Sequence, residues 1–317
     1  MASPRAQVRR VLDETLHSMQ NLERPALLRI LPVLASAQKE VEKDLRHWLA
    51  SHSGETFTAA RYKNALAVLN RAIHEAEIKA AVEHSLKDAA KKHIGPLSLH
   101  NVQREWVSLA TIFDGVAQPL AFEEAAILAE GKRILWPRFE SSAQRYAGSI
   151  GEKTRFQLAV SRSRGETIDE LTRRLQAKLP HVFHGERWDA ERLARTECSN
   201  AAAEYHHEAL VEAAKDDDQL MERWDATHDG RLCPMCASLD GQVVALDEDY
   251  VADWVTFSKK GSRSHHERVG HTIAHPQCRC PRSPWRETWP TFATPSSTET
   301  LAREAPGYKV SFHTRAA

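Results

Sequence analysis

The chain of 317 residues lacks several features that mark specialised classes of protein. No run of about 18 apolar residues occurs, so we expect no membrane-spanning helix. Residues 1–20 are polar and charged without an apolar core, so we expect no secretory signal. Lys plus Arg and Asp plus Glu are balanced at 43 each. This balance argues against broad neutralisation of phosphates as the main role, because nucleic-acid-binding domains usually carry a basic excess.

Cysteine is scarce, but its placement is informative. Four of the five cysteines lie in two short clusters, Cys233-Pro-Met-Cys236 and His275-Pro-Gln-Cys278-Arg-Cys280. The two thiolates of a CxxC pair can occupy two corners of a zinc tetrahedron, and a second Cys/His cluster can supply the others after folding. A reducing cytoplasm favours metal thiolates over disulfides. The sequence therefore predicts a hairpin-centred unit held by one zinc ion, with disulfides as the alternative.

The zinc prediction requires four ligands from five candidates. Cys233 and Cys236 present both sulfurs of a CxxC loop to one point. His275 and Cys278 are three residues apart, and Cys278 and Cys280 can both reach a metal from a tight turn. We favour Cys233, Cys236, His275 and Cys278, with Cys280 in place of His275 as the alternative. Four protein ligands leave no position for water or substrate, so the predicted ion is structural.

The sequence contains no recognisable catalytic zinc motif. Neither His-Glu-x-x-His nor the His-x-Glu and Pro-Cys-x-x-Cys pair of zinc deaminases is present. Arg195 and Glu197 share a helix and could line a charged groove, but ion pairs that fix the helix to a sheet are the favoured interpretation. His265, His266 and His271 could form an accessory metal or pH-sensing cluster, although exposed loop histidines are more common.

The first half of the chain is predicted to be helical. Apolar residues recur at helical spacing, with Pro32 interrupting the first stripe and Gly95-Pro96 ending the second. We expect helices over roughly residues 27–49, 58–94, 100–113 and 120–147.

Two further helices are predicted in the middle of the chain. Thr167-Ile-Asp-Glu170 is a capping box that starts a short helix, which Pro180 ends. Asp189 is a suitable N-cap for a second helix from Ala190 to about Lys215. Cys198 in this helix is interpreted as a small buried hydrophobic residue.

The pattern then changes to short strands. Residues 223–227 and 242–246 are predicted to pair around the CxxC loop. Residues 247–274 are predicted to be a long polar loop, and residues 286–317 a weakly ordered arm rich in Pro, Ser and Thr. The fold class is therefore α+β, with a helical N-terminal region followed by a small mixed α+β domain that contains a Cys/His zinc knuckle.

Several motifs follow one another in a defined order over roughly residues 150–285. The capping-box helix precedes Ala194-Arg-Thr-Glu197, Trp224, Asp229-Gly-Arg231-Leu-Cys233-Pro-Met-Cys236, Leu239-Asp-Gly241 and His275-Pro-Gln-Cys278-Arg-Cys280. This order resembles the phage Mu F-like head-morphogenesis family, which comprises minor head proteins of tailed phages and prophages. The long connection at 247–274 departs from the family's tighter pattern.

The resemblance implies a protein present in few copies inside the phage head. Its implied partners are the portal protein and capsid or scaffold proteins, with DNA as a further candidate, and its implied roles are head assembly and DNA packaging or delivery. It would occupy the host cytoplasm during assembly. We divide the chain into a helical portal- or scaffold-contacting region (1–150), a Mu F-like domain (151–285) and an arm (286–317).

We expect an interaction and assembly protein rather than an enzyme. One alternative is an ADP-ribosyltransferase-like activity, since the family domain has been likened to that fold, or a zinc-containing nuclease. An open cleft around Arg195 and Glu197 would favour the enzyme, whereas ion pairs would favour the assembly role. The other alternative is a DNA-binding zinc module that uses the basic segment 259–268, and steep salt dependence of DNA binding would support it.

Overall fold

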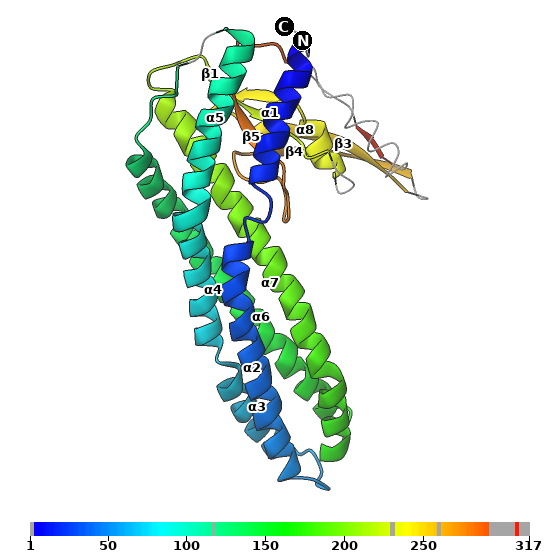
Figure 1. The fold of residues 1–317 in the computed structure, drawn as a ribbon. Coiled ribbons are helices and arrows are strands. Elements are labelled where there is room, and N and C mark those ends of the chain that lie inside the picture. Colours follow the sequence, from blue (N-terminus) through cyan, green and yellow to red (C-terminus); the bar gives the residue numbers. More distant parts are fainter. Residues whose placement is uncertain (1–2, 116–117, 229–231, 259–260, 292–307, 311–317) are drawn as a thin grey trace. The chain divides into compact units, whose positions relative to one another are not determined.

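The computed structural model describes most of the chain (Figure 1). The chain forms two compact units, and each is assembled from segments that are distant in the sequence. Unit 1 comprises Met1–Leu22, Ala90–Ile134 and Cys198–Ala317, and unit 2 comprises Glu23–Ala89 and Leu135–Glu197. The described residues are 3–115, 118–228, 232–258, 261–291 and 308–310.

Unit 2 is built from amphipathic helices. Helices α2 (Arg24–Ala50), α3 (Ala59–Ile73) and α4 (Glu75–Ala89) lie entirely within it, and the long helices α6 (Glu124–Ser163) and α7 (Ile168–Ala213) contribute the parts that belong to this unit. The predicted apolar stripes are confirmed as the buried faces of these helices. They include Leu34, Val41, Leu45, Leu69 and Ile73.

Two predicted helix boundaries in unit 2 are confirmed by their caps. The hydroxyl of Thr58 accepts a hydrogen bond from the Arg61 N–H at 3.4 Å and starts α3. The capping box at the start of α7 is reciprocal: the Thr167 N–H donates to Glu170 at 2.8 Å, and the Glu170 N–H donates to the Thr167 hydroxyl at 3.3 Å.

The helix predicted over residues 58–94 is divided in the structure. His74 adopts a left-handed conformation with φ of 50° and separates α3 from α4. A short π-helical turn, η1 (Ala90–Ile94), leads into α5 (Gly95–Phe113). Pro96 therefore lies in the first turn of a new helix, where its missing N–H costs little, rather than ending the previous one.

The prediction that Pro180 ends a helix is wrong. Helix α7 continues through it, and Pro32 and Pro137 likewise lie inside α2 and α6. All three prolines are exposed. The prediction of an N-cap at Asp189 is also wrong, because this residue lies within α7 and accepts a hydrogen bond from the Lys153 Nζ at 2.7 Å.

Unit 1 combines helices with two antiparallel sheets. Its helical parts are α1 (Pro4–Ser18), η1, α5, the start of α6, the end of α7 and the short α8 (Pro234–Leu239). The first sheet has the order β2-β1-β5, and its strands are β1 (Leu220–Trp224), β2 (Val243–Ala245) and β5 (Arg282–Arg286). The predicted pairing of the strands that flank the CxxC loop is confirmed, with Glu222 opposite Val244.

The prediction of a long loop at residues 247–274 is wrong. This segment contains β3 (Tyr250–Ser258) and β4 (Gly261–Val269), which form an antiparallel pair in a second sheet of order β4-β3-β6 (Figure 1). The remaining strand is β6 (Tyr308–Val310). Strand β4 is mostly polar and exposed, so its sequence resembles a loop, but it pairs along its whole length with the more apolar β3.

The core of the sheet region includes the clustered cysteines. Cys236, Cys278 and Cys280 are buried together with Trp224 and Tyr250. In small domains that are stabilised by a metal ion, buried ligand side chains help to complete a limited apolar core. The predicted α+β class, with a helical N-terminal region and a small C-terminal sheet region, is confirmed.

The first residues beyond β5 belong to the fold of unit 1. Trp289 is buried and stacks on Trp106 of α5 with ring centroids 5.3 Å apart. Most of the predicted arm, residues 292–307 and 311–317, lies outside the described residues. Helix α6 runs through residue 150, and the predicted three-part division of the chain stays a prediction. Among the described helices, none has both the length and the apolar character required to cross a membrane.

Candidate metal centre

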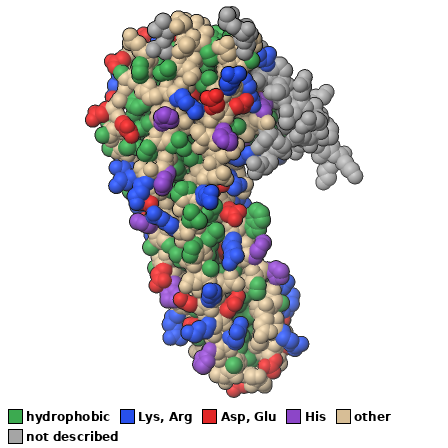
Figure 2. Space-filling model, viewed as in Figure 1, with side chains coloured by type: hydrophobic (Ala, Val, Ile, Leu, Met, Phe, Trp, Pro, Cys, Tyr) green, Lys and Arg blue, Asp and Glu red, His purple; other side chains and the backbone are tan. Residues whose placement is uncertain are grey.

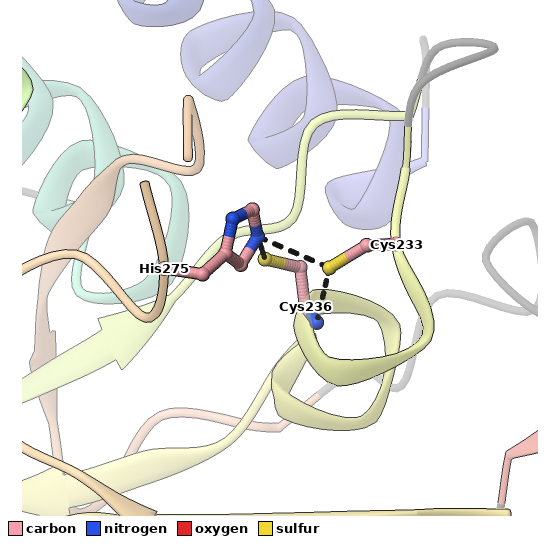
Figure 3. A group of neighbouring side chains, drawn as sticks. All are labelled: Cys233, Cys236 and His275. Atoms are coloured by element: carbon pink, nitrogen blue, oxygen red, sulfur yellow. Dashed lines mark hydrogen bonds between the residues drawn. The ribbon is translucent and has the colours of Figure 1, made fainter. Parts of the chain in front are cut away.

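The CxxC pair is positioned by a short helix. Cys233 is the N-cap of α8 (Pro234–Leu239), and its Sγ accepts a hydrogen bond from the Cys236 N–H at 3.3 Å. Pro234 suits the first helical position because its fixed φ is already helical. This local geometry directs the sulfurs of Cys233 and Cys236 to the same side of the turn (Figure 3).

The second cluster brings a histidine and two further sulfurs to this turn. The His275 Nε2 lies 3.1 Å from the Sγ of Cys233 and 3.1 Å from the Sγ of Cys236 (Figure 3). The Sγ atoms of Cys236 and Cys278 are 3.6 Å apart. Cys236, Cys278 and Cys280 form a second group whose sulfurs all lie within 4.8 Å of one another. The structure thus brings all five predicted ligand residues together around Cys236.

The segment that follows β1 connects the two clusters. The Thr227 hydroxyl donates to the Arg279 carbonyl at 2.9 Å, and the Thr227 N–H donates to the Cys280 Sγ at 3.4 Å. The buried Asp240 carboxylate accepts from the Ala226 N–H at 2.8 Å, and Gly241 turns the chain with φ of +78°. The Leu-Asp-Gly motif therefore supports the site by fixing the segment after β1.

The protons of the cluster are shared unevenly. A hydrogen bond from Cys236 lowers the pKa of Cys233 to about 5, and a hydrogen bond to Cys233 raises the pKa of His275 to about 9. A hydrogen bond from Cys236 also holds the pKa of Cys278 well below its ordinary value. Cys236, which donates to both neighbours, has a raised pKa. The lowered pKa values of Cys233 and Cys278 favour the thiolate form that a metal ion requires of its cysteine ligands.

The donor set fits a zinc ion. A tetrahedral site with ordinary zinc–ligand bond lengths places two sulfurs about 3.8 Å apart and a sulfur about 3.5 Å from an imidazole nitrogen. The separations of 3.6 Å and 3.1 Å are close to these values. None of the five cysteines, all of which are described, is in a disulfide. Metal ligation requires deprotonated sulfurs and a neutral imidazole, so the affinity of this site for zinc would depend on pH.

Arg195 and Glu197 are engaged in separate ion pairs in unit 2. The Arg195 guanidinium donates to Glu23 from Nε at 3.0 Å and from Nη2 at 2.9 Å. Glu197 accepts from the Arg138 Nε at 2.6 Å and from the Ser142 hydroxyl at 2.9 Å. The ion-pair interpretation is confirmed, but the partners come from helical segments rather than from a sheet. Cys198 is buried, as predicted.

The three loop histidines of the sequence prediction do not form one cluster. His265 stacks on Trp254 with ring centroids 4.7 Å apart, and His266 contacts Asp253 at 2.5 Å. His271 instead contacts Glu222 of β1 and stacks on a neighbouring helical histidine. The sequence analysis missed these two partners, because only folding brings residues so distant in sequence together. The predicted turn at 229–231 and Lys259 and Lys260 of the basic segment lie outside the described residues.

Comparison with known proteins supports the order of motifs described above. Residues 153–282 match the model of the family described as "Phage Mu protein F like protein". Neither the curated proteins nor the solved structures gave a match. The matched segment contains the capping box, the CxxC turn and the His275–Cys280 cluster. The family indicates a phage head protein with capsid-related partners and an association with the virion. The predicted resemblance to the Mu F-like family is therefore confirmed by the match over residues 153–282.

Proposed function

We propose that the protein is a minor head protein of a tailed phage or prophage that acts in head assembly through contact with the portal. The observation that carries this proposal is the family match over residues 153–282, because that segment includes both halves of the Cys/His cluster. In this role the protein lies inside the head, after assembly in the host cytoplasm. DNA packaging or delivery is the step it would assist.

The proposed role of the metal is structural. One zinc ion would be held by Cys233, Cys236, His275 and Cys278, because His275 approaches two of these sulfurs and Cys278 approaches Cys236. Cys280 remains the alternative to His275. When bound, zinc would supply a cross-link between the α8 turn and the segment after β4, and four protein ligands would leave it no substrate position.

We propose assembly rather than turnover. This proposal is supported by the pairing of Arg195 with Glu23 and of Glu197 with Arg138, since the enzyme alternative needs these side chains in an open cleft. The alternative DNA-binding role finds little support on the face drawn in Figure 2, where Lys and Arg side chains are interspersed with Asp and Glu.

The test is disruption of the gene in the phage or prophage that encodes the protein. We expect loss of DNA-filled, infectious heads, and restoration when the wild-type gene is supplied in trans. Mass spectrometry of purified virions should detect a few copies per particle, and chemical cross-linking of intact heads should connect this chain to the portal. Normal yields of infectious particles without the protein would contradict the proposal.

Complementation with variants separates the metal site from the rest of the surface. Cys236→Ser should fail to restore infectious heads, because Cys236 belongs to both sulfur groups. His266→Ala is the matched control, since this exposed histidine has its own partner, Asp253, and should restore them fully.

A further inference from the structure

A second cluster of potential metal ligands lies in unit 1, separate from the cysteines. It comprises His207 near the end of α7, Glu222 in the middle of β1 and His271 after β4. The three ligand atoms lie within 4.8 Å of one another. Glu222 is 3.1 Å from the Nδ1 of His271 and 3.8 Å from the Nδ1 of His207. Tetrahedral nitrogen and oxygen ligands of zinc are about 3.4 Å apart, so the two distances bracket the expected value.

Several polar atoms in and around this cluster are buried without a hydrogen-bond partner among the described residues. They are the Oε1 of Glu222, the Nδ1 of His207, both ring nitrogens of His206 and both carboxylate oxygens of Glu105. Orphaned polar atoms are rare in native interiors because each costs about 1–3 kcal/mol, and their concentration in one place points to an unseen water or ion.

The surroundings of the cluster are acidic. Glu105 and Glu222 have completely buried carboxylates. The Arg282 Nε lies 3.8 Å from Glu222, and the His206 ring lies 3.4 Å from Glu222 and 3.9 Å from Glu105. Buried carboxylates are stable only beside cationic groups or metal ions, so this site attracts positive charge.

The surroundings of Glu222 are those of an oriented metal ligand. The Tyr250 hydroxyl donates to the Oε2 of Glu222 at 3.2 Å, which fixes the carboxylate and leaves Oε1 available. Ligand carboxylates are commonly held by such outer hydrogen bonds. The side chains of His207 and His271 are 13% and 21% exposed, so an ion can enter from the solvent side.

We propose that His207, Glu222 and His271 bind a second divalent transition-metal ion of the zinc class. The two imidazole rings are stacked with centroids 3.7 Å apart, so binding requires them to turn until one nitrogen of each faces the ion. The ion satisfies the Oε1 of Glu222 and the Nδ1 of His207, and it joins α7, β1 and the segment after β4. Two imidazoles and one carboxylate leave one coordination position for water, unlike the closed sulfur site.

Cobalt titration of the full-length protein tests this proposal, because the two sites differ in colour. The protein is stripped of metal under reducing conditions and titrated with Co²⁺, and bound ions are counted by native mass spectrometry. An ion at the cysteines produces intense thiolate-to-cobalt absorption, whereas an ion at the histidines produces only weak bands. We expect an ion without thiolate absorption in the wild type, its loss in His271→Ala, and its retention in His266→Ala.

Two results would overturn the proposal. One is a wild-type protein that binds no ion beyond any that shows thiolate absorption, which would mean that protons on the histidines balance the carboxylates. The other is a His271→Ala variant that keeps the additional ion, which would place it elsewhere. If His271→Ala does not fold, His207→Gln provides the same comparison. The number of ions bound by the wild type tests the proposal without any variant. Because the readout excludes thiolate absorption, it is independent of the cysteine site and of the head-protein role.

Discussion

At the scale of single residues, Lys153 and Glu186 illustrate how unit 2 accommodates a buried charge. The Glu186 carboxylate is fully buried, and the Lys153 Nζ lies 2.6 Å from it and 2.7 Å from Asp189. Burial raises the pKa of Glu186 above its ordinary value, although the hydrogen bond from Lys153 opposes the shift. The half-exposed lysine thus offsets much of the cost of a carboxylate that water cannot reach.

Replacement of this lysine should have a pH-dependent cost. Lys153→Met is expected to lower the free energy of unfolding by about 1–3 kcal/mol near neutral pH, because the buried carboxylate loses its partner. Since the folded-state pKa of Glu186 is raised, its contribution to stability is present below pH 4.5 and is lost as pH rises through the folded pKa. The deficit of the variant should therefore shrink on acidification. Urea unfolding between about pH 4 and pH 8 measures it.

Lys79→Met is the matched control. Lys79 contacts Glu140 at 3.3 Å, but both side chains are partly exposed, at 29% and 59%. Its loss should cost less than about 1 kcal/mol. A deficit of Lys153→Met that stays constant across the pH range would contradict the explanation.

Single residues also show where sequence reasoning succeeds. The capping box at Thr167 and Glu170 and the cap at Thr58 follow from local signals of short spacing. Short spacing likewise points to the five residues that the structure brings together around the CxxC turn, and their role as metal ligands stays a prediction. The cluster of His207, Glu222 and His271 does not follow from the sequence, because it joins a helix, a strand and a loop whose proximity only the fold determines.

At the scale of elements, the long helix α7 tolerates Pro180, which the sequence analysis predicts to end a helix. Pro180 removes one backbone hydrogen bond from α7. Packing of the buried face on both sides of the proline nevertheless keeps the helix continuous. Leu175, Leu179 and Phe183 around the proline are all buried. Tertiary packing outweighs local propensity here, and this is the physical reason that the predicted helix end was wrong.

Pro180→Ala should therefore stabilise the protein. The side chain is exposed, so no packing is lost, and alanine restores the missing N–H. We expect the free energy of unfolding to rise by about 1–3 kcal/mol, after allowance for the greater freedom of the unfolded chain. Urea unfolding followed by circular dichroism measures it.

The matched control is Pro4→Ala, which should have little effect, because Pro4 lies in the first turn of α1, where the N–H is unpaired anyway. A Pro180→Ala variant no more stable than the wild type would indicate that the surrounding turn is adapted to proline.

Strand β4 is the converse case: pairing with a neighbour forms an element that the sequence does not predict. Its residues 261–269 contain little apolar alternation, so the sequence predicted a loop. The strand exists because β3 supplies a partner along its full length. Strand propensity depends on such neighbours more than on the residues themselves.

At the scale of the whole molecule, the candidate metal site of the cysteines belongs to unit 1 alone. Both cysteine clusters lie within Cys198–Ala317, whereas unit 2 contains neither. The binding free energy of a structural zinc ion contributes directly to the folding of the part of the chain that holds it. Loss of the ion should therefore act on one unit first.

Chelation of the metal-loaded protein should loosen unit 1 selectively. We expect amides of β1, β2, β5 and α8 to lose hydrogen-exchange protection, while amides of α2, α3 and α4 keep theirs. Cys236→Ser should reproduce the pattern without chelator, and His266→Ala should resemble the untreated wild type. Equal loss of protection in both units would show that they unfold as one.

The interleaving of the two units has a consequence for the order in which the chain folds as it is synthesised. The polypeptide passes from one unit to the other after Leu22, Ala89, Ile134 and Glu197. At about 5–20 residues per second, the ribosome needs roughly 9 to 35 seconds to travel from residue 22 to residue 198. Throughout that interval the first helix of unit 1 has been synthesised, whereas its sheets have not. Unit 2 can close once Glu197 has emerged, so the newborn chain should complete its second unit before its first.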